Sequence, residues 1–229
     1  MKERPIIFSD EMVRAILDGR KTQTRRAMKP QPVKNGAFWE WGGAGWSMDH
    51  GVVPVVPGHS MSARCPYGQP GDRLWVREAW QGPLVSEEDM AADPTWAKDL
   101  SVYQTPGHCA YRASGDSCEF FDAHEDEVVA RWRPSIHMPR WACRLLLEVT
   151  AVRVERLQDI GDSDAAMEGV EEQGYDWVNY RYRDDSHVAL SARASFSTLW
   201  DSINGLGAWN TNPWVWVVEF QRVDSEVPS

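Results

Sequence analysis

Apolar and polar positions near the start of the chain repeat with helical spacing. Four apolar residues share one face of this segment: Met12, Val13, Ile16 and Leu17. Ser9 precedes them, and a serine hydroxyl can accept a hydrogen bond from the first turn of a helix. Gly19 follows them, and glycine commonly supplies the left-handed residue that ends a helix. The pattern therefore predicts a short helix between Ser9 and Gly19.

Three later segments have the pattern of β-strands. The strongest signal covers residues 143–156, where apolar positions recur and β-branched residues fill the second half. Residues 73–80 follow a turn at Gly71-Asp72 and place Leu74 and Val76 on one side. Residues 214–222 form the third strand. We expect a long, bent strand at 143–156 and shorter ones at the other two segments.

Two further helices are expected between the long strand and residue 214. Residues 159–169 predict a short helix with Asp162 or Ser163 as its cap and Glu168 in its last turn. Residues 190–204 predict an amphipathic helix that ends at Asn204-Gly205. The apolar side of this second helix consists of Ala192, Phe196, Leu199, Trp200 and Ile203.

Two long stretches interrupt these elements. Residues from about 30 to 70 are rich in glycine and proline and lack periodicity, which indicates a long ordered loop or insertion. Residues from about 82 to 141 form a second insertion, with one compact strand-like piece at Cys109–Ala113. Non-local strands without βαβ crossovers favour an α+β barrel with flanking helices. We expect a single domain over residues 1–223 and a flexible tail over residues 224–229.

The composition narrows the class of protein. No apolar run is long enough to span a bilayer and no signal-peptide stretch begins the chain, so we expect a soluble, cytoplasmic protein. The four cysteines lack the spacing of a zinc site, which favours free thiols and no metal; they are Cys65, Cys109, Cys118 and Cys143. The chain also lacks a phosphate-binding glycine loop and a dinucleotide fingerprint, so no cofactor is expected.

Three of the 13 tryptophans lie in the glycine-rich stretch: Trp39, Trp41 and Trp46. Exposed rings there could stack on bases. Packing of the long stretch onto the body of the protein is the favoured interpretation, because large aromatic side chains usually belong to a core.

Positive charge is concentrated between Arg14 and Lys29, although the whole chain has a net charge of -10. This segment carries a single acid, Asp18, against six basic residues, which are Arg14, Arg20, Lys21, Arg25, Arg26 and Lys29. Such a contrast favours a focused anion site over a general nucleic-acid coat. The alternative is an ordinary basic run exposed on a loop.

Five segments in order resemble the ASCH family, whose fold is a small β-barrel similar to the RNA-associated PUA domain. The first, Gly19–Arg25, resembles the family's G-x-K-x-x-x-R segment. The others are Gly71–Val76, Leu147–Thr150, Ala166–Gly169 and Trp216–Phe220. The resemblance implies a PUA-like barrel, here with two long insertions that compact members lack. Longer relatives of this type often come from prophage genomes.

A compact branch of that family, the bacterial N(4)-acetylcytidine amidohydrolases, uses a Lys, a Thr and a Glu at matching positions. The resemblance therefore implies that Lys21, Thr24 and Glu168 are catalytic. A desolvated lysine can accept the proton of a threonine hydroxyl, which then attacks an acyl carbon. Alternatively, Lys21 and Glu168 form an ordinary salt bridge and Thr24 is structural. A regular strand would direct Lys21 and Thr24 to opposite faces, so catalysis requires a turn or bulge between them.

Several other residues are candidates for binding. Arg20, Arg25 and Arg26 can hold a phosphate or carbonyl oxygen, and Arg77 lies on the strand at 73–80. Two prolines stiffen residues 132–141 as a loop, and we expect that loop to present Ser135, His137 and Arg140. His137 can supply acid–base chemistry or be a hydrogen-bonded structural residue.

Three functions remain open from the sequence. The first is an ASCH-type protein that binds a nucleobase, nucleotide or RNA, with amidohydrolase activity on an acylated cytidine. The second is a non-catalytic reader of RNA or of a modified base, and the third is a metal-independent ribonuclease. The expected partners are a modified nucleoside or a short single-stranded RNA, without a membrane.

Overall fold

The computed structural model describes residues 1–122, 127–182 and 187–223. Within these residues a mostly β core is combined with four α-helices, so the predicted α+β class is confirmed. The helices are α1 (Asp10–Leu17), α2 (Glu87–Ala92), α3 (Asp162–Met167) and α4 (Ala192–Asn204).

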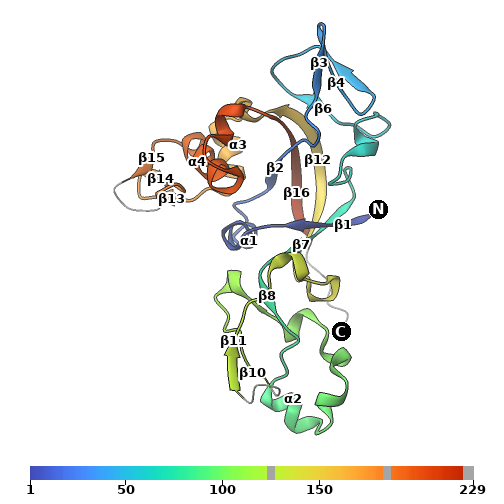
Figure 1. The fold of residues 1–229 in the computed structure, drawn as a ribbon, viewed down its shortest axis with the longest axis vertical. Helices are drawn as coiled ribbons and strands as arrows, with labels where there is room; N and C mark the ends of the chain where they lie inside the picture. Colours follow the sequence, from blue (N-terminus) through green and yellow to red (C-terminus); the bar gives the residue numbers. More distant parts are fainter. Residues whose placement is uncertain (123–126, 183–186, 224–229) are drawn as a thin grey trace. The chain divides into compact units, whose positions relative to one another are not determined.

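The largest sheet has six strands in the order β1-β7-β12-β16-β2, with β6 pairing β12 (Figure 1). Its strands are β1 (Glu3–Ile7), β2 (Gln23–Ala27), β6 (Val53–Pro54), β7 (Arg73–Arg77), β12 (Leu146–Arg156) and β16 (Trp214–Val223). Among the described strands the order ends at β1 and β2, and no closed barrel is formed.

The chain forms two compact units. Unit 1 comprises residues 1–2, 15–73 and 148–222, and unit 2 comprises residues 3–14, the described part of 74–147 and residue 223. Strands β7, β12 and β16 therefore each contribute residues to both units. The predicted tail, residues 224–229, lies outside the described residues.

In unit 1, β12 and β16 supply the centre of the core. Val149, Val152 and Val154 of β12 are at most 5% exposed, and the buried positions change from odd to even numbers after Val149. This change of phase fits a bend in the strand. Strand β16 also pairs antiparallel with β2, with Val217 opposite Arg25. The segment after Gly19 is thereby fixed against the core.

The helix ends follow local signals with one exception. Ser9 accepts a hydrogen bond from the Met12 amide at 3.5 Å, and Gly19 has a φ of 75°, as the sequence predicts. Ser191 caps α4. The predicted cap of α3 at Asp162 or Ser163 is wrong, because Gly161 occupies that position and these two residues already lie within the helix. Glu168 is the residue that ends α3.

The glycine-rich stretch after β2 forms a small antiparallel sheet, which the sequence does not predict. Its strands are β3 (Val33–Asn35), β4 (Phe38–Trp41) and β5 (Ala44–Trp46). The tryptophans of this sheet pack on β16 in edge-on ring contacts: Trp39 and Trp46 contact Trp214, and Trp41 contacts Trp216. These three tryptophans therefore pack onto the rest of the protein, as the favoured interpretation of the sequence predicts.

A second small sheet of unit 1 lies after α3 and contacts α4. It consists of β13 (Glu172–Gln173), β14 (Asp176–Val178) and β15 (Val188–Ala189), joined by antiparallel pairs. The sequence contains no long alternating run here, so these short strands are not predicted.

Unit 2 has its own apolar cluster around Trp80, Tyr111 and Met138. Two short strands, β8 (Trp80–Gln81) and β9 (Ala110–Tyr111), pair beside it. The strand-like piece predicted at Cys109–Ala113 corresponds to β9. A hairpin of β10 (Glu119–Asp122) and β11 (Glu127–Ala130) was not predicted.

The four cysteines are free thiols in the structure. Of the helices in the described part of the chain, none has the length and apolar character needed to cross a membrane.

Candidate functional site

Lys21 and Glu168 form a buried ion pair in unit 1. The Lys21 side chain is fully buried, and its Nζ donates to Glu168 Oε2 at 3.0 Å and to the Glu168 carbonyl oxygen at 2.8 Å. Lys21 lies between α1 and β2, and Glu168 ends α3. Gly169, with a φ of 86°, permits this approach because a Cβ there would lie 2.8 Å from Lys21 Cβ.

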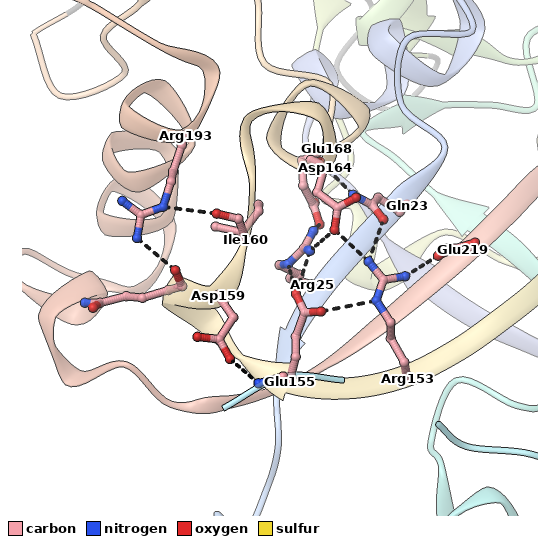
Figure 2. Close-up of polar contacts among 12 residues, drawn as sticks. Gln23, Arg25, Arg153, Glu155, Asp159, Ile160, Asp164, Glu168, Arg193 and Glu219 are labelled. Atoms are coloured by element: carbon pink, nitrogen blue, oxygen red, sulfur yellow. Dashed lines mark hydrogen bonds and ion pairs between the residues drawn. The ribbon is translucent and has the colours of Figure 1, made fainter. Parts of the chain in front are cut away.

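Arg25 on β2 is bonded to three carboxylates (Figure 2). Its Nη1 donates to Glu168 at 3.1 Å. Its Nη2 donates to Glu155 and to Asp164, each at 2.6 Å. The guanidinium is fully buried, so these acids replace the water that it loses.

Arg153 on β12 extends this cluster. Its guanidinium donates to Glu155 at 3.2 Å, to Asp164 at 2.7 Å and to Glu219. Gln23 accepts a hydrogen bond from Arg153 at 3.4 Å and donates to the Asp164 carbonyl at 2.6 Å. We call the set the Arg25 network: Lys21, Gln23, Arg25, Arg153, Glu155, Asp164, Glu168 and Glu219.

Burial and neighbouring charges shift the pKa of three members of the network. Burial lowers the pKa of Lys21, although Glu168 opposes the change. Burial alone would also lower the pKa of Arg25, but Glu168 and Glu155 raise it above its usual value. Burial would raise the pKa of Asp164, and the bonds from Arg25 and Arg153 lower it instead. Lys21 therefore gives up its proton more readily than an exposed lysine does.

Thr24 is only 2% exposed and lies opposite Val218 in the pairing of β2 with β16. Alternation along a strand places its side chain on the other face from Gln23 and Arg25, and on the same face as Arg26. Thr24 therefore belongs to the Arg26 side of β2, whereas Lys21 Nζ reaches Glu168 from the segment before the strand.

A hollow of about 390 Å³ opens beside the end of β2. We call it the Arg26 hollow. Of the described residues that line it, two are cationic, two are aromatic, one is an amide and none is acidic: Arg26, Ala27, Lys29, Pro66, Tyr67, Asn204 and Trp216. All of them belong to unit 1.

The walls of the Arg26 hollow come from distant parts of the chain. Trp216 is 1% exposed and its ring lies edge-on to Trp41, so it forms a rigid floor. Asn204 at the end of α4 donates its amide to the Trp200 carbonyl at 3.0 Å. That bond leaves the Asn204 side-chain oxygen as an acceptor. Tyr67 comes from the predicted 30–70 insertion, which therefore supplies part of the lining.

Arg26 connects the hollow to the buried ion pair. Burial lowers its pKa, while the charges of Tyr67 and Glu168 act to raise it. In return, the charge of Arg26 contributes to the lowered pKa of Lys21. The charges of the Lys21–Glu168 pair thus interact electrostatically with Arg26 at the wall of the hollow.

Arg20, also predicted to bind, lies apart from the Arg26 hollow. It is exposed, donates to Asp18 at 3.0 Å and to the Gly169 carbonyl at 3.2 Å. It lines a larger hollow of about 670 Å³ together with Met167 and Trp177.

The remaining predicted binding residues belong to unit 2. Arg77 donates to the Ile136 carbonyl, and Arg140 donates to Glu3 at 2.9 Å. Ser135 lines a hollow of about 520 Å³ that also contains both Arg112 and its ion-pair partner Asp10. His137 is exposed in the same turn. The structure thus divides the predicted site residues between the two units.

Residues of two groups are not identified from the sequence: Glu155 and Asp164 of the Arg25 network, and Tyr67 and Asn204 of the Arg26 hollow. Tyr67 in a loop and Asn204 at a helix end carry no local signal for binding, since a single tyrosine or asparagine has many uses. Glu155 and Asp164 carry one weak signal, an acid placed among apolar neighbours on the strand at 143–156 or the helix at 159–169. Only the fold brings them to Arg25.

No protein-family model, curated protein or solved structure matches this chain. In the described part of the chain, no group of three or more His, Cys, Asp or Glu side chains is placed to hold a metal ion.

Proposed function

We propose that unit 1 is an ASCH-like module that binds a nucleobase or nucleotide in the Arg26 hollow. The observation that carries this proposal is the lining of the hollow: two cations, two aromatic rings and an amide, with no acid among the described lining residues. The resemblance of Gly19–Arg25 and four later segments to the ASCH family supports it.

Each lining residue has a role that suits a base. Tyr67 is partly exposed and offers a ring on which a base can stack. The Asn204 side-chain oxygen can accept from an exocyclic amine, such as N4 of cytosine. Arg26 can donate to a carbonyl oxygen of the base. A volume of about 390 Å³ lies within the range of small-ligand pockets.

Isothermal titration calorimetry with cytidine and N(4)-acetylcytidine tests the proposal. We expect saturable binding of at least one of them to the wild type, and a weaker affinity in an Asn204→Ala variant. Uridine, adenosine and guanosine are titrated in the same way. If none of the five nucleosides binds, a base pocket is refuted.

Amidohydrolase activity is a second candidate, favoured by the buried Lys21 amine whose pKa burial lowers. An uncharged Lys21 would take the proton of the Thr24 hydroxyl as its oxygen attacks the acyl carbon. Glu168 would pass this proton from the Lys21 ammonium to the leaving amine as the bond between the acyl carbon and the amine breaks, and water would then hydrolyse the acyl-threonine. Strand alternation places Thr24 on the Arg26 side of β2, whereas Glu168 bonds Arg25 on the other face, so this activity requires Thr24 and Lys21 to meet at the start of the strand.

Acetate release from N(4)-acetylcytidine tests this activity. The wild type should release acetate, whereas Lys21→Ala and Thr24→Ala should not, with both variants folded by circular dichroism. If the wild type binds the nucleoside without releasing acetate, unit 1 is a reader and not a hydrolase.

A further inference from the structure

Lys29 gives the Arg26 hollow a positive charge that the fold does not use. Arg25 on β2 and Arg153 on β12 are neutralised by carboxylates of the Arg25 network. Lys29 differs from them: within the part of the chain that the structure describes, no hydrogen bond or ion pair engages its ammonium. In a chain of net charge -10, an acid-free hollow with two cations is selective for an anion.

We infer that the ligand of this hollow carries a phosphate beside its base, so that the pocket takes a nucleotide in preference to a free nucleoside. This inference rests on the proposed function. It assigns the phosphate to Lys29, a residue outside the motif Gly19–Arg25 that carries the family resemblance.

The positions of the two cations separate the base from the phosphate. Arg26 is partly buried on β2, opposite Trp216, and so lies at the inner wall. Lys29 lies two residues beyond the end of β2 and is exposed, and so lies at the rim. A base seated on Tyr67 and Trp216 would direct its sugar and phosphate outward, toward Lys29.

The chemistry of Lys29 suits a phosphate. A lysine ammonium is a compact charge with three donors on a flexible stem, and it pairs with phosphate without requiring a fixed angle. A nucleoside monophosphate carries about -1.5 to -2 charges near neutral pH. One charge-assisted hydrogen bond of this kind strengthens binding by about tenfold or more.

Calorimetry with matched probes tests the inference. Cytidine, cytidine 5′-monophosphate and orthophosphate are titrated into the full-length wild type, Lys29→Gln and the control Lys98→Gln. Lys98 is exposed in unit 2, and its replacement changes the net charge equally. We expect the monophosphate to bind the wild type and the control about tenfold more tightly than cytidine. In Lys29→Gln this preference should disappear, while cytidine affinity stays the same.

The outcomes separate the inference from the proposed function. Equal affinity of the wild type for cytidine and its monophosphate overturns the phosphate inference and leaves the base pocket standing. The proposed function is overturned if cytidine and its monophosphate do not bind and N(4)-acetylcytidine, uridine, adenosine and guanosine do not bind either. It is also overturned if the monophosphate and orthophosphate bind with equal affinity. A preference for the monophosphate that persists in Lys29→Gln overturns the assignment to Lys29.

A further arm distinguishes the two sources of such a phosphate. A trinucleotide that begins with 5′-phosphorylated cytidine presents the same base and phosphate at a strand end. Tighter binding than the mononucleotide would support a single-stranded nucleic acid as the source, and equal or weaker binding would support a free nucleotide.

Discussion

Lys21 Nζ lies 3.0 Å from Glu168 Oε2, and both side chains are at most 3% exposed. These two residues are 147 positions apart in the chain. A buried ion pair gives little net stability over an apolar pair, but removing one partner leaves an unpaired charge that is costly. The predictions below follow from this pair, from its neighbours and from the hollow beside it.

Replacing Lys21 with methionine should destabilise the protein by about 3 kcal/mol, since Glu168 then loses its closest cation. Urea unfolding of the variant measures the change. Lys34→Met is the matched control, because Lys34 pairs with Asp49 where both side chains are about half exposed; it should cost less than about 1 kcal/mol. Equal effects of the two changes would contradict a special role for burial.

Gly169→Ala should destabilise the protein by at least about 3 kcal/mol, through left-handed strain combined with overpacking. The new Cβ would lie 2.8 Å from both Ala15 Cβ and Lys21 Cβ. Gly174→Ala is the matched control, because Gly174 also has a positive φ but a Cβ there would meet nothing within 4 Å. It should destabilise the protein by about 1 kcal/mol through backbone strain alone. Thermal and urea unfolding compare the two variants, and similar losses would refute the close approach of Gly169 to Lys21.

Asp164 should contribute to stability in a pH-dependent way. Its pKa is lowered in the folded state by Arg25 and Arg153, which outweigh burial. The stabilisation is therefore present above the unfolded pKa and is lost as the pH falls through the lower, folded value. Between about pH 5 and about pH 2, the unfolding free energy of Asp164→Asn should fall less steeply than that of the wild type. The control is Glu172→Gln, a change at an exposed carboxyl. If the unfolding free energy of Asp164→Asn fell as steeply with pH as that of this control, the lowered pKa of Asp164 would be contradicted.

Tyr67→Ala should weaken binding of the nucleotide by roughly 5- to 150-fold, because base stacking on an aromatic ring is worth about 1–3 kcal/mol. Tyr175→Ala is the matched control, since Tyr175 is fully exposed and does not line the Arg26 hollow. Calorimetry measures both variants. An unchanged affinity in Tyr67→Ala would show that the base does not stack there.

The elements that the sequence predicts well are those whose signals are local. Ser9 and Gly19 bound α1, and alternation marks β12 and β16, because capping and burial of one face depend on neighbours in the chain. The short strands β3–β5 and β13–β15 escape prediction, since two to four residues are too few to define a period.

The candidate site was predictable only in part, for the same reason. Lys21 and Glu168 are identified as site residues through the resemblance of their segments to the ASCH family. The bond between Arg25 and Glu155 spans 130 residues, and Tyr67 meets Arg26 only through the folding of the 30–70 insertion. Such contacts depend on sheet order and loop packing, which no local pattern encodes.

A crystal structure of the protein with saturating cytidine 5′-monophosphate would show whether a base occupies the Arg26 hollow. We predict density for the base against Tyr67 and Trp216, with the phosphate beside Lys29. Ligand density at another surface, with the Arg26 hollow free of nucleotide, would contradict the account.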